Sequence, residues 1–156
     1  MRYALIYGLL SGMVIMVVIL GGSTLAPNSA IFQTVWFGYL VMVVAMTFLF
    51  VGVKRYRDVE KGGVIRFLPA LYMGLAIGLV AVIAYVLIWE GYLAATRYAF
   101  IDQYFSGPGM AEARAWYSNP LNRVFWTSLE LGPVALIVAF VSAALLRNPK
   151  LLPARR

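Results

Sequence analysis

The chain has 156 residues, of which 63% are hydrophobic and 12% charged, and its net charge is +7. Its mean hydropathy is +0.85. A soluble domain carries roughly 25% charged residues, so this composition excludes a water-soluble fold and predicts a membrane protein. The chain contains neither Cys nor His, which excludes disulfide scaffolds, Cys/His zinc sites and imidazole-based triads. We expect no cofactor and no enzymatic activity.

Four apolar runs carry no charge, residues 3–20, 35–53, 67–89 and 131–146, and their lengths are near the roughly 20 helical residues that a hydrocarbon core of about 30 Å requires. With extensions at their ends, the expected spans are residues 3–20, 31–53, 67–89 and 125–146, and residues 90–124 form the expected outer loop. The uncharged connection over residues 21–30 is expected to be a turn. The predicted fold class is all-α: a polytopic membrane protein whose single domain, residues 1–156, is an up-down bundle of four transmembrane helices with a helical outer loop.

The basic residues lie mostly on one side of these spans. Three of them, Arg97, Arg114 and Arg123, fall on the outer side. The other ten border the inner ends of the spans: Arg2, Lys54, Arg55, Arg57, Lys61, Arg66, Arg147, Lys150, Arg155 and Arg156. Loops rich in Lys and Arg remain in the cytoplasm, so we expect both termini to be cytoplasmic (N-in/C-in).

The inner loop over residues 54–66 is expected to determine this topology and to attract anionic lipid headgroups, at about 1 kcal/mol per basic residue. Its basic residues are Lys54, Arg55, Arg57, Lys61 and Arg66. We expect Arg57 and Asp58 to be structural and to connect the end of the second helix to the turn at Gly62 and Gly63. A nucleic-acid partner is not expected, because the charges lie at membrane borders.

The outer loop is rich in aromatic residues. We expect the third helix to project to Phe105, to break at residues 106–109 and to be followed by a short helix over residues 111–117. Asn119 and Pro120 then turn the chain back, and Pro133 is expected in the first turn of the fourth span. The aromatic residues favour an interfacial belt and an amphipathic cap, with a ligand-binding aromatic cage as the alternative.

Two carboxylates mark the outer ends of the third and fourth spans, Glu90 and Glu130. We expect them to pair with Arg97 or Arg123 in the folded cap. The alternative is a catalytic carboxylate dyad, as a lipid-modifying enzyme at the outer interface would require.

Small residues recur at helical spacing on the first and third spans. They are Gly8, Gly12, Ala70, Gly74 and Gly78. Lipid provides no hydrophobic force between helices, so close backbone approach at such residues drives association. We expect these helices to pack within one chain; a homodimer seam is the alternative. Residues 4–12 and 70–78 share the pattern A-L-x-x-G-L-x-x-G, which suggests two parallel helical hairpins.

Transport usually requires ionisable groups at mid-membrane, and the spans offer only hydroxyl groups such as Ser11, Thr47 and Ser142. We therefore expect a structural or interaction protein that contacts membrane lipids and associates with itself or with a larger membrane partner. The alternative is a small transporter or channel for a neutral or lipophilic solute.

The inner loop and the residues around it carry a recognisable motif. Its positions are Gly52, Lys54, Tyr56, Arg57, Asp58, Gly62, Gly63, Ile65 and Phe67. With the spaced glycines that follow, the chain resembles a bacterial membrane family catalogued as domain of unknown function 4199. The resemblance implies a multi-pass protein of the bacterial inner membrane and supplies no activity. Members often carry a proline near the end of the projecting third helix, whereas residues 101–105 here have none, which implies a different outer cap.

Overall fold

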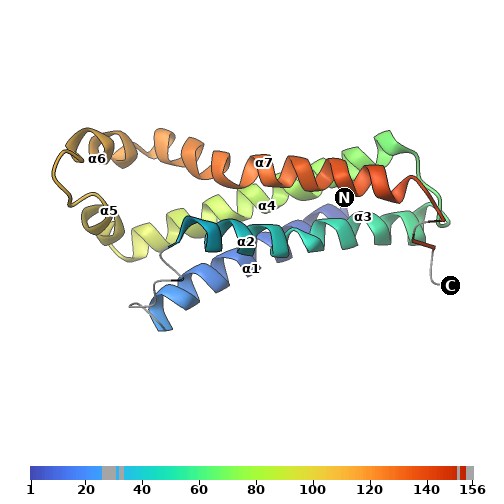
Figure 1. The fold of residues 1–156 in the computed structure, drawn as a ribbon, viewed down its shortest axis with the longest axis horizontal. Helices are drawn as coiled ribbons and strands as arrows, with labels where there is room; N and C mark the ends of the chain where they lie inside the picture. The colour runs from blue at the N-terminus through green and yellow to red at the C-terminus, as the bar shows by residue number, and fades with distance from the viewer. Residues whose placement is uncertain (26–30, 32–33, 151, 154–156) are drawn as a thin grey trace.

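The computed structural model describes residues 1–25, 31, 34–150, 152 and 153, and these residues form helices and connections without a strand. Figure 1 shows an elongated up-down bundle: α1 and α4 run one way, and α2–α3 and α7 run back. Two short helices, α5 and α6, cover one end, and the two chain termini lie toward the other. Of the expected turn over residues 21–30, residues 21–25 instead continue the first helix, which ends at Leu25, and residues 26–30 lie outside the described residues.

The helices are, in order, α1 (Arg2–Leu25), α2 (Val35–Ala45), α3 (Thr47–Glu60), α4 (Phe67–Ala95), α5 (Ala99–Tyr104), α6 (Ala111–Ser118) and α7 (Pro120–Leu146). Within the part of the chain that the structure describes, four segments are long and apolar enough to cross a membrane: Arg2–Gly22, Val35–Glu60, Phe67–Ala95 and Pro120–Leu146. The predicted all-α class with four such helices is therefore confirmed.

α2 and α3 together make one of these segments. At the junction, the Met46 N–H donates to the Met42 carbonyl at 2.9 Å, and Phe50 donates to the Met46 carbonyl at 3.4 Å. The Thr47 hydroxyl also donates to the Val44 carbonyl at 2.7 Å. A threonine that bonds back to its own helix bends it slightly, so the hydrogen-bonded ladder continues through this junction with a local distortion.

The predicted projection of the third helix to Phe105 is wrong. α4 ends at Ala95, and the chain reverses through Arg97 and Tyr98, whose φ angles are +52° and +60°. The Thr96 hydroxyl donates to a carbonyl of the last turn, and the Tyr98 N–H donates to the Leu93 carbonyl at 2.7 Å. These bonds satisfy the carbonyls that a helix end leaves open, so the helix ends here without glycine or proline.

The later parts of the outer loop lie close to where they were expected. Residues 105–110 leave the helical conformation, and α6 follows almost at the expected position. The Asn119 side chain accepts a hydrogen bond from the Leu121 N–H at 3.0 Å, and Pro120 occupies the first turn of α7. Because α7 begins at Pro120, Pro133 lies inside the helix and not in its first turn, which corrects that expectation.

α4 lies against α1 through backbone-to-backbone contact. A methyl group placed on Gly8 would lie 2.6 Å from the Val80 Cβ and 2.7 Å from the Ile77 carbonyl oxygen. A methyl group on Gly12 would lie 2.8 Å from the Ala81 carbonyl oxygen. Only glycine permits this separation, and close approach of this kind is how helices associate in lipid.

α4 meets α7 through a second set of small residues. A methyl group on Gly74 would lie 3.0 Å from the Ala139 Cβ, and one on Gly78 would lie 3.1 Å from the Ala135 Cβ. Ala70, one turn earlier, is completely buried. The small residues of the sequence pattern therefore face other helices of the same chain, and α4 is the central helix of the bundle.

Replacing Gly12 by Ala should destabilise the bundle, because the added methyl group meets a backbone oxygen that has no room to move. Overpacking costs about 1 to 3 kcal/mol. Gly21→Ala, in the same helix, is the matched control, since its added methyl group meets nothing within 4 Å. Thermal unfolding in detergent should show a lower midpoint for Gly12→Ala only; equal midpoints for the two variants would contradict the packing described.

Candidate functional site

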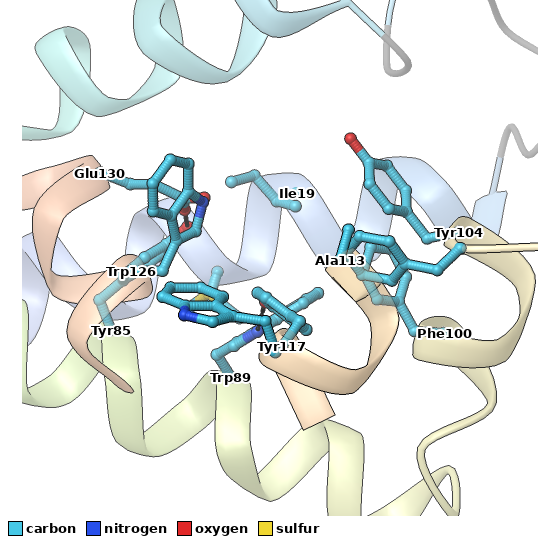
Figure 2. Close-up of a pocket in the computed structure, with 12 residues that line it drawn as sticks. Ile19, Tyr85, Trp89, Phe100, Tyr104, Ala113, Tyr117, Trp126 and Glu130 are labelled. Carbon is cyan, nitrogen blue, oxygen red and sulfur yellow. Dashed lines mark hydrogen bonds between the residues drawn. The ribbon is translucent and has the colours of Figure 1, made fainter. Parts of the chain in front are cut away.

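A cavity of about 640 Å³ lies at the end of the bundle that α5 and α6 cover. The side chains that line it come from α1, α4, α6 and α7 and from α5 with the residue that follows it (Figure 2). They are Met16, Ile19, Tyr85, Trp89, Phe100, Tyr104, Phe105, Ala113, Trp116, Tyr117, Trp126 and Glu130. This volume is within the range of pockets that enclose drug-sized ligands.

Aromatic rings form a closed series along one part of the wall. Trp89 lies edge-on to Phe100, Phe100 stacks on Tyr104, and Phe105 contacts both Tyr104 and Tyr117, with ring centroids 5.0 to 5.4 Å apart. The Trp89 indole N–H donates to the Tyr117 hydroxyl oxygen at 3.1 Å and closes the series. Ring pairs at such distances stabilise by about 0.5 to 1.5 kcal/mol each beyond area burial, so this wall is preformed.

Polar atoms enter the cavity at few points. The Tyr85 hydroxyl donates to Glu130 Oε2 at 3.2 Å. Burial raises the pKa of the Tyr117 phenol, which therefore remains protonated at neutral pH. Among the described residues that line the cavity, Glu130 is the only one with an ionisable acid or base other than a phenol. In Figure 2, Trp126 and Glu130 lie on one side of the space and Phe100 and Tyr104 on the other.

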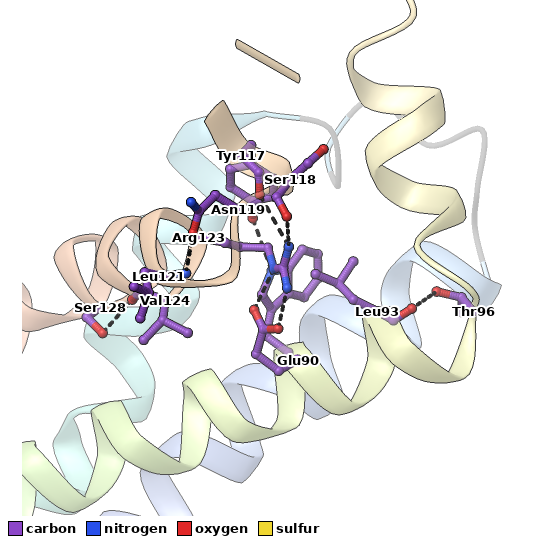
Figure 3. Close-up of polar contacts among 11 residues, drawn as sticks. Glu90, Leu93, Thr96, Tyr117, Ser118, Asn119, Leu121, Arg123, Val124 and Ser128 are labelled. Atoms are coloured by element: carbon purple, nitrogen blue, oxygen red, sulfur yellow. Dashed lines mark hydrogen bonds and ion pairs between the residues drawn. The ribbon is translucent and has the colours of Figure 1, made fainter. Parts of the chain in front are cut away.

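An ion pair between Glu90 and Arg123 adjoins this aromatic wall. Glu90 accepts two hydrogen bonds from the Arg123 guanidinium, at 2.6 Å from Nε and 2.7 Å from Nη2 (Figure 3). Arg123 also donates to the Tyr117 and Ser118 carbonyls at 3.3 Å, and its guanidinium carbon lies 5.2 Å from the centre of the Tyr98 ring. The side chain of Arg123 is 2% exposed. This pair connects α4, α6 and α7 and fixes the positions of Trp89 and Tyr117, which adjoin it.

The two outer carboxylates do not act on each other in the described structure. Glu90 pairs with Arg123, as expected from the sequence. Glu130 instead accepts a hydrogen bond from Tyr85 and has no ion pair among the described residues, which corrects the expectation for this carboxylate. The arrangement gives no support to a carboxylate dyad. It leaves Glu90 as a structural group and Glu130 as the acid that faces the cavity.

At the other end of the molecule, Arg57 is fully buried. Its guanidinium donates to the Leu152 carbonyl at 2.5 Å and to the Leu146 carbonyl at 3.5 Å, and its Nε pairs with Asp58 at 2.7 Å. The Arg57 carbonyl, in turn, accepts from the Gly63 N–H at 3.0 Å. The expected connection to the glycine turn is therefore made by the backbone of Arg57, while its side chain binds the end of α7, which the sequence had not indicated.

The other inner-loop residues divide into exposed and packed groups. Arg55, Lys61 and Arg66 are exposed, while Lys54 is partly buried and pairs with Asp58 at 2.6 Å.

The remaining residues of the motif adopt special backbone conformations or pack against other helices. Gly62 and Gly63 have φ angles of +63° and +89°. The Tyr56 ring lies 5.8 Å from that of Tyr3, and the Phe67 ring lies 5.3 Å from that of Phe140. A methyl group on Gly52 would lie 2.9 Å from the Tyr7 Cβ. The motif thus connects α1, α3, α4 and α7 at the end of the bundle opposite the cavity.

Sequence reasoning missed several members of the outer cavity. Met16 and Ile19 resemble any apolar residues of a span, and Tyr85 is one of several tyrosines in the spans. One signal was available: Tyr85 and Trp89 are four residues apart and therefore share a helix face, near the end of the span that precedes the aromatic loop. The aromatic residues of the outer loop thus line a cavity, and ligand binding by an aromatic cage stays a prediction.

Comparison with known proteins gives one match. A family model described as "Protein of unknown function (DUF4199)" matches residues 2–148. No curated protein and no solved structure matches the chain.

Replacing Arg57 by Ala should lower the stability of the inner end, since the Leu146 and Leu152 carbonyls lose a charged donor. Hydrogen bonds to charged groups contribute about 1.5 to 3 kcal/mol. Arg55→Ala removes the same charge from an exposed neighbour and is the matched control. Expression level and unfolding midpoint should fall for Arg57→Ala alone, and topology reporters should show the same orientation for both; an equal response in stability would mean that the buried contacts contribute little.

Proposed function

We propose that this chain, which belongs to the DUF4199 family of proteins of unknown function, is a multi-pass protein of the bacterial inner membrane. We further propose that it binds a lipophilic small molecule at its outer end. The bound molecule occupies the aromatic cavity. Binding, and not catalysis, is the proposed role.

The proposed topology places both termini and the inner loop in the cytoplasm. Its support is the asymmetry of basic residues, ten on the inner side against three on the outer side. Exposed Arg55, Lys61 and Arg66 are suited to contact anionic headgroups at the cytoplasmic surface. On this topology α5, α6 and the cavity lie at the outer interface, where aromatic residues accumulate.

The observation that carries the proposal is the size and lining of the cavity. Eight of its twelve lining residues are aromatic, and the cavity that they line has a volume of about 640 Å³. Binding sites of membrane and soluble proteins alike are concave and mainly apolar, with few polar groups that fix orientation. The polar groups available here are the Glu130 carboxyl, the hydroxyls of Tyr85, Tyr104 and Tyr117, and the indole N–H groups of the tryptophans.

A structural or interaction role, which the sequence favoured, has less support. Its motivation was the small-residue faces of the first and third spans, and Gly8, Gly12, Gly74 and Gly78 are all in contact with other helices of the same chain. Association with a second copy or a larger membrane partner would therefore use another surface. Transport of a lipophilic solute would begin with binding in the same cavity, so the binding test comes first.

The test uses tetraphenylsilane, a neutral lipophilic probe, and thermal unfolding of the protein in detergent. A ligand that binds only the folded state raises its stability, so the probe should raise the unfolding midpoint of the wild type. Ala113 lines the cavity, and Ala113→Trp should abolish the rise by filling it. Ala115→Trp, on the same helix outside the cavity, should retain it. An unchanged wild-type midpoint, or the same rise in both variants, would refute binding in the cavity.

A further inference from the structure

Glu130 is the one described residue at the cavity wall that can carry a full charge at neutral pH, and no basic residue lines the cavity beside it. Its Oε2 accepts a hydrogen bond from Tyr85, and no ion pair of Glu130 is found among the residues that the structure describes. A half-buried carboxylate without a cationic partner favours a ligand that supplies one.

The outer end of the molecule differs in charge from the rest. Residues 90–130 contain four acidic and three basic side chains, a net charge of −1, although the whole chain has +7. Arg123 pairs with Glu90, and Arg114 pairs with Asp102. Two of the three arginines of this segment are thus already paired with other carboxylates, and no ion pair joins Glu130 to an arginine in the described structure.

The aromatic lining adds a second attraction for positive charge. The faces of Trp and Tyr rings are negative, and a cation over them gains about 0.5 to 2 kcal/mol. Trp89, Trp116, Trp126 and Tyr104 all line the same space as Glu130. The cavity therefore offers a ligand both a carboxylate that can pair with a positive charge and aromatic rings that can contact its apolar groups.

We infer that the ligand is a lipophilic cation, an apolar body with a delocalised or fully substituted positive charge that sits beside Glu130. This inference rests on the proposed binding function of the cavity and adds the charge of the ligand to it. A neutral ligand of the same shape would bury Glu130 without a partner, which is costly, and an anion would meet direct repulsion.

The experiment compares three ligands of one shape and different charge: tetraphenylphosphonium, tetraphenylsilane and tetraphenylborate. Affinities are measured by titration against the intrinsic tryptophan fluorescence of the detergent-solubilised protein. We expect the cation to bind at least about tenfold more tightly than the neutral probe, equivalent to about 1.4 kcal/mol, and the anion to bind most weakly. This order is measured on the wild type, so it does not depend on the folding of any variant.

Glu130→Gln keeps the shape of the side chain and removes its charge, so it should eliminate the preference for the cation while affinity for tetraphenylsilane remains. Glu112→Gln removes the same charge from an exposed residue of α6 outside the cavity, and it should leave the preference intact. Equal affinity for cation and neutral probe in the wild type, or a preference that survives in Glu130→Gln, would overturn the inference while leaving the binding function standing. Failure of all three ligands to bind would overturn both.

Discussion

The structure depends on the close approach of α1 and α7 to the two sides of α4. In lipid this contact gains nothing from the exclusion of water, so it relies on dispersion forces between backbones that only small residues bring close enough. Gly8 and Gly12 serve the α1 side, and Gly74 and Gly78 serve the α7 side. Beyond Ala84, α4 carries Tyr85 and Trp89 toward its outer end. Large rings replace small residues at this level, and the cavity lies where the close contact ends.

Two buried arginines connect the opposite ends of α7 to neighbouring helices. Arg123, in its first turn, pairs with Glu90 of α4, and Arg57 of α3 donates to the Leu146 carbonyl in its last turn. Helix ends leave backbone groups without partners, and the planar, permanently charged guanidinium can serve several acceptors at once. Arg123 contacts Tyr117 in the wall of the cavity, and Arg57 connects the family motif to Leu146 and Leu152.

The sequence predicted the features that depend on composition and short spacing. Long uncharged runs indicate the four helices, and small residues four apart indicate their contacting faces. The end of α4 was missed because Arg97 and Tyr98 adopt a conformation that glycine usually supplies, and nothing local marks it. The partners of Arg57 were missed because Leu146 and Leu152 are distant in the sequence. The cavity is lined by residues of five helices, so the sequence alone indicated only that the outer loop is rich in aromatic residues.

The most direct test of the central claim, that α4 packs between α1 and α7 of its own chain, is a disulfide between Gly74→Cys and Ala139→Cys. The native chain has no cysteine, so any crosslink comes from this pair. A Cβ at position 74 lies 3.0 Å from that of Ala139, so the two helices need to separate by only about 0.5 Å to reach the Cβ–Cβ range of a disulfide. We expect oxidation in the membrane to give an internally crosslinked monomer. Crosslinked dimers, or thiols that remain free, would contradict it.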